Sequence, residues 1–443
     1  MNEQMNQRLT VTALAGSSCG LLFGYDIGAI AGAAPDLRLQ FALSAAALGV
    51  AVSSALFGTI AGSMAAGYLA DVIDRRNTLV VACLAYMCAT LGAVSAFGFV
   101  QFAVCRLLCG FAIGLISVTS PMYLAEISPA RLRGRLVGSF QLSLSFGVVL
   151  AFALGYVLSL HCQPGLAWRW LVAANLLPAA LCEALLLKAS PSPRWLTLKG
   201  RFAEARDALV ALGSEDAADN LAIPTLSLSA LDDAQQSKLF SRRHARPIAL
   251  AVSIAIFNQL SGVNVLLYYI LDVFRDLGSG HLNGRRDAIL IASLSLLVTV
   301  ISVSVIDKVG RKPLLLAGAL GMGACLVLLP AIRYMHWPAL TVVIAIACYN
   351  ACFGFSQGVV VWVYLSEIFP LPVRARGQSL GSTVHWVINA IVVGAFPAVV
   401  NYLGGKVFLA FAVMMVLQFF TVLFVYPETK RASLESLASS IGS

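Results

Sequence analysis

One acidic side chain, Asp26, lies in the middle of the first long apolar stretch of the chain. An ionised carboxylate inside a hydrocarbon layer costs roughly 2.5–3.5 kcal/mol, so Asp26 needs either a proton or a charged partner. Arg106 is the candidate partner, because no other Lys or Arg lies well inside an apolar stretch. The pKa of a carboxyl group falls beside a guanidinium and rises when it is buried without one. Joining and separating the pair would therefore load and release a proton, whereas a permanent pair would only lock two helices; spacing alone leaves both open.

Long apolar stretches must hold these side chains. Of 443 residues, 59% are hydrophobic and 12% charged, against roughly 45–50% and about 25% in soluble proteins. A helix needs about 20 apolar residues to cross a membrane. Twelve stretches reach this length, at 9–31, 45–69, 77–97, 101–124, 136–158, 168–187, 247–274, 287–308, 312–333, 338–363, 376–402 and 405–426. We therefore expect an all-α membrane protein with 12 transmembrane helices.

The basic residues are distributed unevenly among the loops. The chain has 30 Lys and Arg against 21 Asp and Glu, and most of the basic residues lie in the tails and in the loops on the side of the N-terminus. This positive-inside bias predicts a multi-pass protein of the plasma (inner) membrane with both termini in the cytoplasm. The net positive charge thus reflects topology and does not indicate a nucleic-acid partner. The ten cysteines show no disulfide or metal-ligand spacing, so we expect no metal and no cofactor.

Two short motifs occur twice, at matching places in the two halves of the chain. They are Asp71…Arg75-Arg76 with Asp307…Arg311-Lys312, and Glu126…Arg133-Gly134 with Glu367…Arg374. Such repeats indicate a duplicated six-helix unit with a substrate path between the halves. We expect a bundle at 1–187, a linker with short helices at 188–246, a second bundle at 247–426 and a tail at 427–443.

Further motifs lie at fixed places around this repeat. Phe23-Gly24-Tyr25-Asp26 is in the first stretch, Gln259…Gly262…Asn264…Tyr268-Tyr269 in the seventh, and Pro427-Glu428-Thr429-Lys430 after the twelfth. In this order the motifs resemble those of the sugar porter family of the major facilitator superfamily, over essentially the whole chain. The resemblance implies a major facilitator fold in which two six-helix bundles are joined by cytoplasmic linker helices. It also implies a transporter rather than an enzyme, working as a monomer in the lipid bilayer.

The duplicated charged motifs are expected to hold the inner side of the transporter closed. The resemblance assigns the network to Asp71, Arg75, Arg76, Glu126, Arg133, Arg194, Asp307, Arg311, Glu367, Arg374 and Glu428. Exposed ion pairs contribute only about 0–1 kcal/mol each, so only a connected network would bias the conformation. The alternative is that these charges merely orient the helices in the membrane.

The first-half motifs depart from the family pattern at two positions. Asp74 stands where the family usually has glycine, and Ser190-Pro191 replaces the usual Pro-Glu before Ser192. By this interpretation the first half lacks one acidic member of its network.

The resemblance also indicates where a sugar would bind. Sugars need several hydrogen-bonding groups and an apolar or aromatic face in a concave site. Substrate-binding residues are then expected at Phe23, Gln141, Asn258, Gln259, Asn264, Ser295, Trp362 and His385, with Tyr268 and Tyr269 as gate residues. Amides inside a membrane also join helices, but four of them exceed what that role requires.

Three pocket positions differ from the family. Asn258 replaces a glutamine, Ser295 replaces an asparagine, and His385 stands where an amide is usual. All three still form hydrogen bonds, which favours a sugar or polyol other than plain glucose. Valines at 359 and 361 replace prolines, which is expected to stiffen the tenth helix.

The function expected from these residues is proton-coupled uptake of a monosaccharide or related polyol. The resemblance favours symport because proton symporters of the family tend to carry Asp at the Asp26 position, where passive facilitators tend to carry Asn. A passive uniporter is the alternative, and a non-transporting sugar sensor is a further one.

Overall fold

The computed structural model describes residues 7–129, 131–163, 165–213, 238–268, 281–335 and 337–430. Within these ranges the chain forms helices and no strand. Twelve helical segments of the described chain are long and apolar enough to cross a membrane, and they coincide with the twelve predicted stretches. The expectation of an all-α membrane protein with a major facilitator fold is confirmed.

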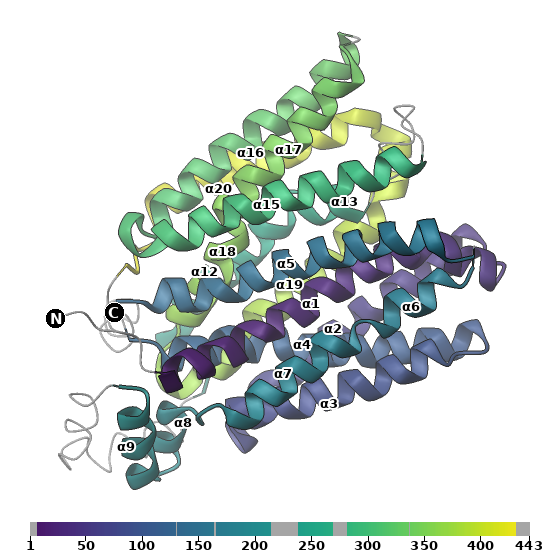
Figure 1. Cartoon of the computed structure of the whole chain (residues 1–443). Helices are drawn as coiled ribbons and strands as arrows, with labels where there is room; N and C mark the ends of the chain where they lie inside the picture. Colours follow the sequence, from purple (N-terminus) through teal and green to yellow (C-terminus); the bar gives the residue numbers. More distant parts are fainter. Residues whose placement is uncertain are drawn as a thin grey trace.

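The first six spans form one bundle, drawn from purple to teal in Figure 1. They are α1 (Gln7–Gln40), α2 (Ala45–Ile73), α3 (Arg75–Val94), α4 (Phe99–Ile127), α5 (Arg133–His161) and a broken sixth span made of α6 (Ala167–Ala173) and α7 (Leu176–Lys188). Small residues allow α2 and α4 to approach closely, because a Cβ atom at Gly114 would meet the backbone N–H nitrogen of Ser63 at 2.7 Å.

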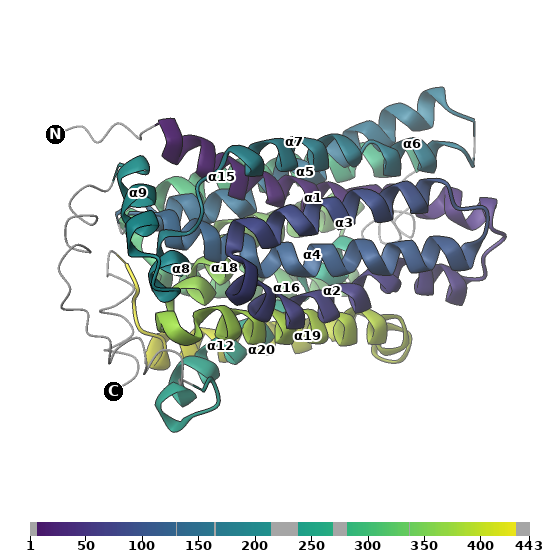
Figure 2. The same ribbon diagram turned by 90° about the horizontal axis from the view of Figure 1, so that it is seen from below.

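The other six spans form the second bundle, drawn from teal to yellow in Figure 1. They are α12 (Ala245–Gln259) with α13 (Val263–Tyr268), α15 (His281–Val309), α16 (Arg311–Tyr334), α17 (Ala339–Phe355) with α18 (Gln357–Glu367), α19 (Arg374–Leu403) and α20 (Val407–Val425). Two short helices, α8 (Pro193–Leu198) and α9 (Phe202–Ala211), precede the second bundle. They lie at the end of the molecule where α1 begins and α20 ends (Figure 2), which we call the linker end.

The two bundles meet most extensively along α5 with α15 and α2 with α19, and α18 also contacts α5 and α4. Between α2 and α19 the hydroxyls of Ser63 and Thr383 are 3.0 Å apart. Gly67 allows this approach, because a Cβ atom there would meet the carbonyl oxygen of Ala375 at 2.8 Å.

Three spans are broken in the membrane, and each break carries polar residues. The sixth is interrupted at Asn175, the seventh after Gln259 and the tenth at Ser356. Gly262 makes the second break possible: its φ is +85°, and a side chain there would meet the ring of Phe411. The interruption of the tenth span lies before Val359 and Val361, which are inside the continuous helix α18, so the expected stiffening at these valines stays a prediction. Broken helices free backbone and side-chain polar groups for a binding site.

Candidate functional site

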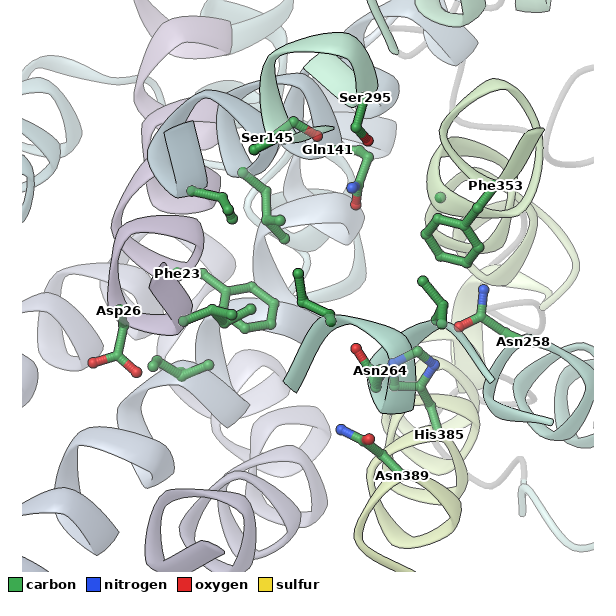
Figure 3. A pocket seen from close by; sticks show the side chains of 18 of the residues that line it. Phe23, Asp26, Gln141, Ser145, Asn258, Asn264, Ser295, Phe353, His385 and Asn389 are labelled. Atoms are coloured by element: carbon green, nitrogen blue, oxygen red, sulfur yellow. The ribbon is translucent and has the colours of Figure 1, made fainter. Parts of the chain in front are cut away.

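A cavity of about 160 Å³, lined by both apolar and polar side chains, lies between the two bundles. A cavity of roughly 150 Å³ is enough to hold benzene, so this one matches a single six-membered ring in size. Its lining includes every side chain that the sequence assigned to proton coupling or substrate binding: Phe23, Asp26, Arg106, Gln141, Asn258, Gln259, Asn264, Ser295, Trp362 and His385. Figure 3 shows Asp26 on the opposite side of the cavity from Asn258 and His385, with the ring of Phe23 between them.

Three amides from the broken seventh span form one hydrogen-bonded cluster. The amide nitrogen of Gln259 donates to the side-chain oxygen of Asn258 at 3.2 Å, and its oxygen accepts from Asn264 at 2.7 Å. The same amide nitrogen lies 2.7 Å from the His385 Nε2 atom. The cluster is buried at Asn258 and Gln259, and it fixes the orientation of the polar groups that face the cavity.

Aromatic side chains from both halves form a closed circuit beside these amides. Successive ring centroids are 6.4 Å apart for Phe23–Phe140, 5.6 Å for Phe140–Trp362, 5.4 Å for Trp362–His385, 5.1 Å for His385–Trp386 and 5.6 Å for Trp386–Phe23. The Trp362 indole N–H also donates to Gln141 across the two bundles, at 3.0 Å. An aromatic surface next to hydrogen-bonding amides is what a sugar ring requires.

Asp26 and Arg106 are in contact. The two guanidinium nitrogens of Arg106 lie 2.5 Å and 3.0 Å from the two carboxylate oxygens of Asp26. Tyr86 donates its hydroxyl to Asp26 at 2.7 Å, and the Asn175 amide is 3.5 Å from the same oxygen. Asp26 and Arg106 are 5% and 3% exposed. A buried bidentate pair of this kind is stable only while both partners are present, since removing one leaves an uncompensated charge.

Sequence reasoning missed several polar residues of this site. Tyr86 and Asn175 complete the surroundings of Asp26, and they hydrogen-bond to each other. Asn350 and Asn389 line the cavity, and neither side-chain polar atom of buried Asn389 has a hydrogen-bond partner. A polar residue within an apolar stretch was the available signal. Asn389 follows His385 by four residues, so it shares a helix face with a predicted site residue.

The predicted gate tyrosines add little to this geometry. Tyr268 is the last residue of α13, and its side chain lies outside what the structure describes. Tyr269 lies outside the described residues. Their gating role therefore stays a prediction.

The charged motifs form buried networks at the linker end. In the first half Arg75 pairs with Glu126 at 2.9 Å and with Asp71 at 3.4 Å. In the second half Arg311 pairs with Glu367 at 2.8 Å and with Asp307 at 3.1 Å. Arg75 and Arg311 are at most 1% exposed, so these pairs differ from exposed surface ion pairs.

Two members of the networks connect the halves. Asp307 accepts hydrogen bonds from the backbone N–H groups of Gly134 and Arg135, at 3.1 Å and 2.9 Å. Asp71 lies 3.6 Å from Arg376 on the opposite bundle. These contacts join the two bundles at the linker end.

The remaining predicted network residues lie at the same end. Arg76 donates to the last carbonyl groups of α7, at Leu186 and Leu187. Arg133 and Arg374 begin α5 and α19 and are buried, and Arg194 lies in α8. Glu428 accepts from the backbone N–H groups at the start of α16.

Three cysteines far apart in the sequence meet inside the first bundle. The Sγ atom of Cys182 lies 3.1 Å from that of Cys19 and 3.4 Å from that of Cys83, and all three residues are buried. Spacing analysis did not indicate this cluster, because each cysteine lies in a different span.

Twelve spanning helices in two bundles, with a cavity between the bundles, define a membrane transporter with the major facilitator fold. The chain belongs to the sugar transporter family, whose model, described as "Sugar (and other) transporter", matches residues 12–440.

Relatives of known name agree with this assignment. The D-xylose-proton symporter of Escherichia coli K12 is 31% identical, over 99% of this chain and 96% of that protein. The solved structure of the proton:xylose symporter XylE bound to 6-bromo-6-deoxy-D-glucose is 30% identical and covers 98% of this chain and 99% of that chain, with a TM-score of 0.92. The inward-open conformation of the E. coli xylose transporter, at 30% identity over 98% of this chain and 99% of that chain, gives a lower TM-score of 0.75.

Proposed function

We propose that this protein couples the inward movement of a proton to uptake of a monosaccharide or related polyol. The observation that carries the proposal is the buried Asp26–Arg106 pair in the wall of the cavity. A carboxylate inside a membrane is costly unless it takes part in function or is paired. The carboxylate of Asp26 is paired and also borders the space where a substrate would bind. Substrate binding, protonation of Asp26 and formation of the Asp26–Arg106 pair can therefore influence one another.

The chemistry of the cavity supports a substrate of sugar type. It offers amide groups and an aromatic surface, and its size suits one ring. The named relatives handle D-xylose or hold a bromodeoxyglucose. We propose a pentose or hexose, or a polyol of similar size, with Gln141, Gln259, Asn264 and Trp362 as ligands.

The contacts at the linker end indicate which state of the transport cycle is present. Asp307 and Asp71 hold the bundles together there, and the fit to the inward-open relative is the poorer one. We assign the linker end to the cytoplasm, with both termini on that side of the inner membrane, and take this state as closed to the cytoplasm. The bundles at 1–187 and 247–426 would then rock about the cavity as units of a monomer.

Uptake by proteoliposomes tests the function directly. The purified protein should accumulate D-xylose or D-glucose inside vesicles when an inward proton gradient is imposed, and should only equilibrate it without one. Equal uptake in both conditions would identify a passive uniporter. Sugar binding without any uptake would identify a sensor.

Gln259 should be essential for affinity. Replacing Gln259 with Ala removes a ligand and leaves Asn264 and His385 without their partner. Since a hydrogen bond contributes about 0.5–1.5 kcal/mol, we expect the Kd for D-xylose, measured by calorimetry, to rise about two- to tenfold for each hydrogen bond to the sugar that is lost.

Gln418 provides the matched control. It is equally buried and pairs with Gln357 at 2.6 Å, but it does not line the cavity. Gln418→Ala should lower thermal stability and keep the Kd. Equal losses of affinity in both variants would mean that Gln259 acts only through packing.

A further inference from the structure

The two halves place a carboxylate differently at equivalent helix starts. In the second half, the carboxylate of Glu428 accepts hydrogen bonds from the backbone N–H groups of Arg311 and Lys312, both at 3.0 Å. Gly310 precedes this helix with φ at +106°, and a Cβ atom there would meet Glu428 at 2.6 Å. The missing side chain at Gly310 therefore makes room for the carboxylate that caps α16.

The first half has the same arrangement of segments, but the residues at the glycine and glutamate positions differ. Ser192 donates to Glu126 at 2.5 Å, as Thr429 donates to Glu367 at 2.6 Å, so the segments before α8 and after α20 correspond. Pro191 then occupies the place of Glu428. No carboxylate can come from that position in the first half.

Asp74 occupies the place of Gly310 and brings a carboxylate of its own. It immediately precedes α3, and its φ of +78° and ψ of 157° belong to a region that is essentially restricted to glycine. A side chain held there costs roughly 1–3 kcal/mol. Asp74 is 1% exposed, and neither of its carboxylate oxygens has a hydrogen-bond partner.

We propose that Asp74 is the displaced gate carboxylate of the first half and a proton-binding site separate from Asp26. The two departures, Asp74 for glycine and Pro191 for glutamate, then compensate for each other, because Asp74 supplies the carboxylate that Pro191 lacks. We call this pair of replacements the compensating exchange. On this proposal the first half does not lack an acidic member. The carboxylate is present, but it is supplied from the helix start and lies buried, whereas Glu428 is exposed.

The surroundings of Asp74 determine how it responds to pH. The charged or titratable groups that act on it from neighbouring elements are Arg75, Tyr123, Glu126 and Arg201. Burial raises the pKa of Asp74 to about 6, and Glu126 adds to this effect. The nearby backbone N–H groups of Arg75 and Ser192, which do not reach hydrogen-bonding geometry, and the Arg75 guanidinium lower the pKa without cancelling the effect of burial.

The sign of the effect follows from linkage. When the linker end opens, Asp74 meets water and its pKa returns toward the ordinary 3.8. The closed state therefore binds the proton more tightly and gains stability as pH falls from about 6 to about 4. Between about pH 7 and pH 5 the ratio of closed to open molecules should rise about tenfold. If the proposed function holds, cytoplasmic acidification slows a transporter that itself imports protons.

Hydrogen exchange in the detergent-solubilised protein tests the titration without requiring transport. Asp74→Asn keeps the size of the side chain and mimics the protonated form. At about pH 7.5 the wild type should exchange faster than this variant in peptides from the α2–α3 and α4–α5 junctions, and at about pH 5 the two should agree. A difference that is the same at both pH values would overturn the proton-binding site. Failure of proton-coupled uptake would leave this result unaffected.

A double-mutant cycle tests the compensating exchange. Pro191→Glu should open the linker end in the wild-type background, because it adds a carboxylate next to Asp74 and Glu126. In the Asp74→Gly background the same substitution should close it, since the new glutamate then finds the space and the helix start that Glu428 uses. Comparing backgrounds cancels any intrinsic effect of replacing the proline. An effect of equal sign and size in both backgrounds would overturn the exchange.

Discussion

Replacing Asp26 with Asn is expected to abolish accumulation of sugar against a gradient while sparing exchange of sugar between equal concentrations. The amide fits the same space, but it carries no charge for Arg106 to hold and binds no proton at neutral pH. Each co-transported proton contributes about 2.3 kcal/mol per 100 mV of membrane potential, which corresponds to about fiftyfold accumulation. The measurement is uptake and counterflow of radiolabelled D-xylose in the same proteoliposomes.

Asp36 offers a matched control on the same helix. It lies in α1 ten residues further along and does not line the cavity. Asp36→Asn should leave accumulation intact. If Asp26→Asn instead accumulates sugar normally, the proton binds elsewhere. If it loses exchange together with accumulation, the pair is a structural lock between α1 and α4.

The sequence was sufficient for the architecture and for ten of the residues that line the cavity, for a physical reason. A helix that crosses a membrane must be apolar along its length, so each polar residue within one stands out. Asp26 and Arg106 were found this way, Gln259 and Asn264 were found from the family resemblance, and all four line one cavity. The duplicated Asp and Glu motifs likewise predicted two networks, because duplication of a chain segment repeats its residues together with the contacts that they make.

What the sequence could not give is the pairing of residues from different spans. Tyr86 and Asn175 are ordinary residues of their own helices, and only the packing of α3 and the α6–α7 break against α1 brings them to Asp26. Asp74 is a second case in which the sequence did not reveal a contact between distant segments. Its position suggested a lost interaction, but the space that it fills depends on a segment more than a hundred residues away.

The cavity and the linker-end networks act together through α5. This helix carries Gln141, which contacts Trp362 in the cavity, and its first turn rests on Asp307 of the other bundle. Opening the linker end must pull the start of α5 away from Asp307. The same movement would separate Gln141 from Trp362. Sugar binding and opening of the linker end would therefore both depend on the position of α5.

Replacing Asp307 with Asn is therefore expected to open the linker end. Asp307 is 6% exposed and is shared by the N–H groups of Gly134 and Arg135 and by the Arg311 guanidinium. The amide of the variant keeps one oxygen that accepts a hydrogen bond. It replaces the other carboxylate oxygen with an NH2 group, which then faces an N–H donor. Hydrogen bonds to charged groups contribute about 1.5–3 kcal/mol, so the open state should gain about tenfold to a hundredfold. Faster hydrogen exchange at the start of α5, with unchanged exchange at its far end, is the measurement.

Gly134→Ala should give the same result by a steric route, because a Cβ atom at Gly134 would collide with the Asp307 carboxylate. Glu204→Gln is the control. It removes a carboxylate at the linker end from the exposed Arg201–Glu204 pair at α9. This pair takes part in neither of the two contacts between the bundles, Asp307 with the start of α5 and Asp71 with Arg376. The control variant should leave exchange unchanged. Wild-type protection of α5 in both Asp307→Asn and Gly134→Ala would show that this contact does not hold the two halves together, and closure would then depend on the α2–α19 interface.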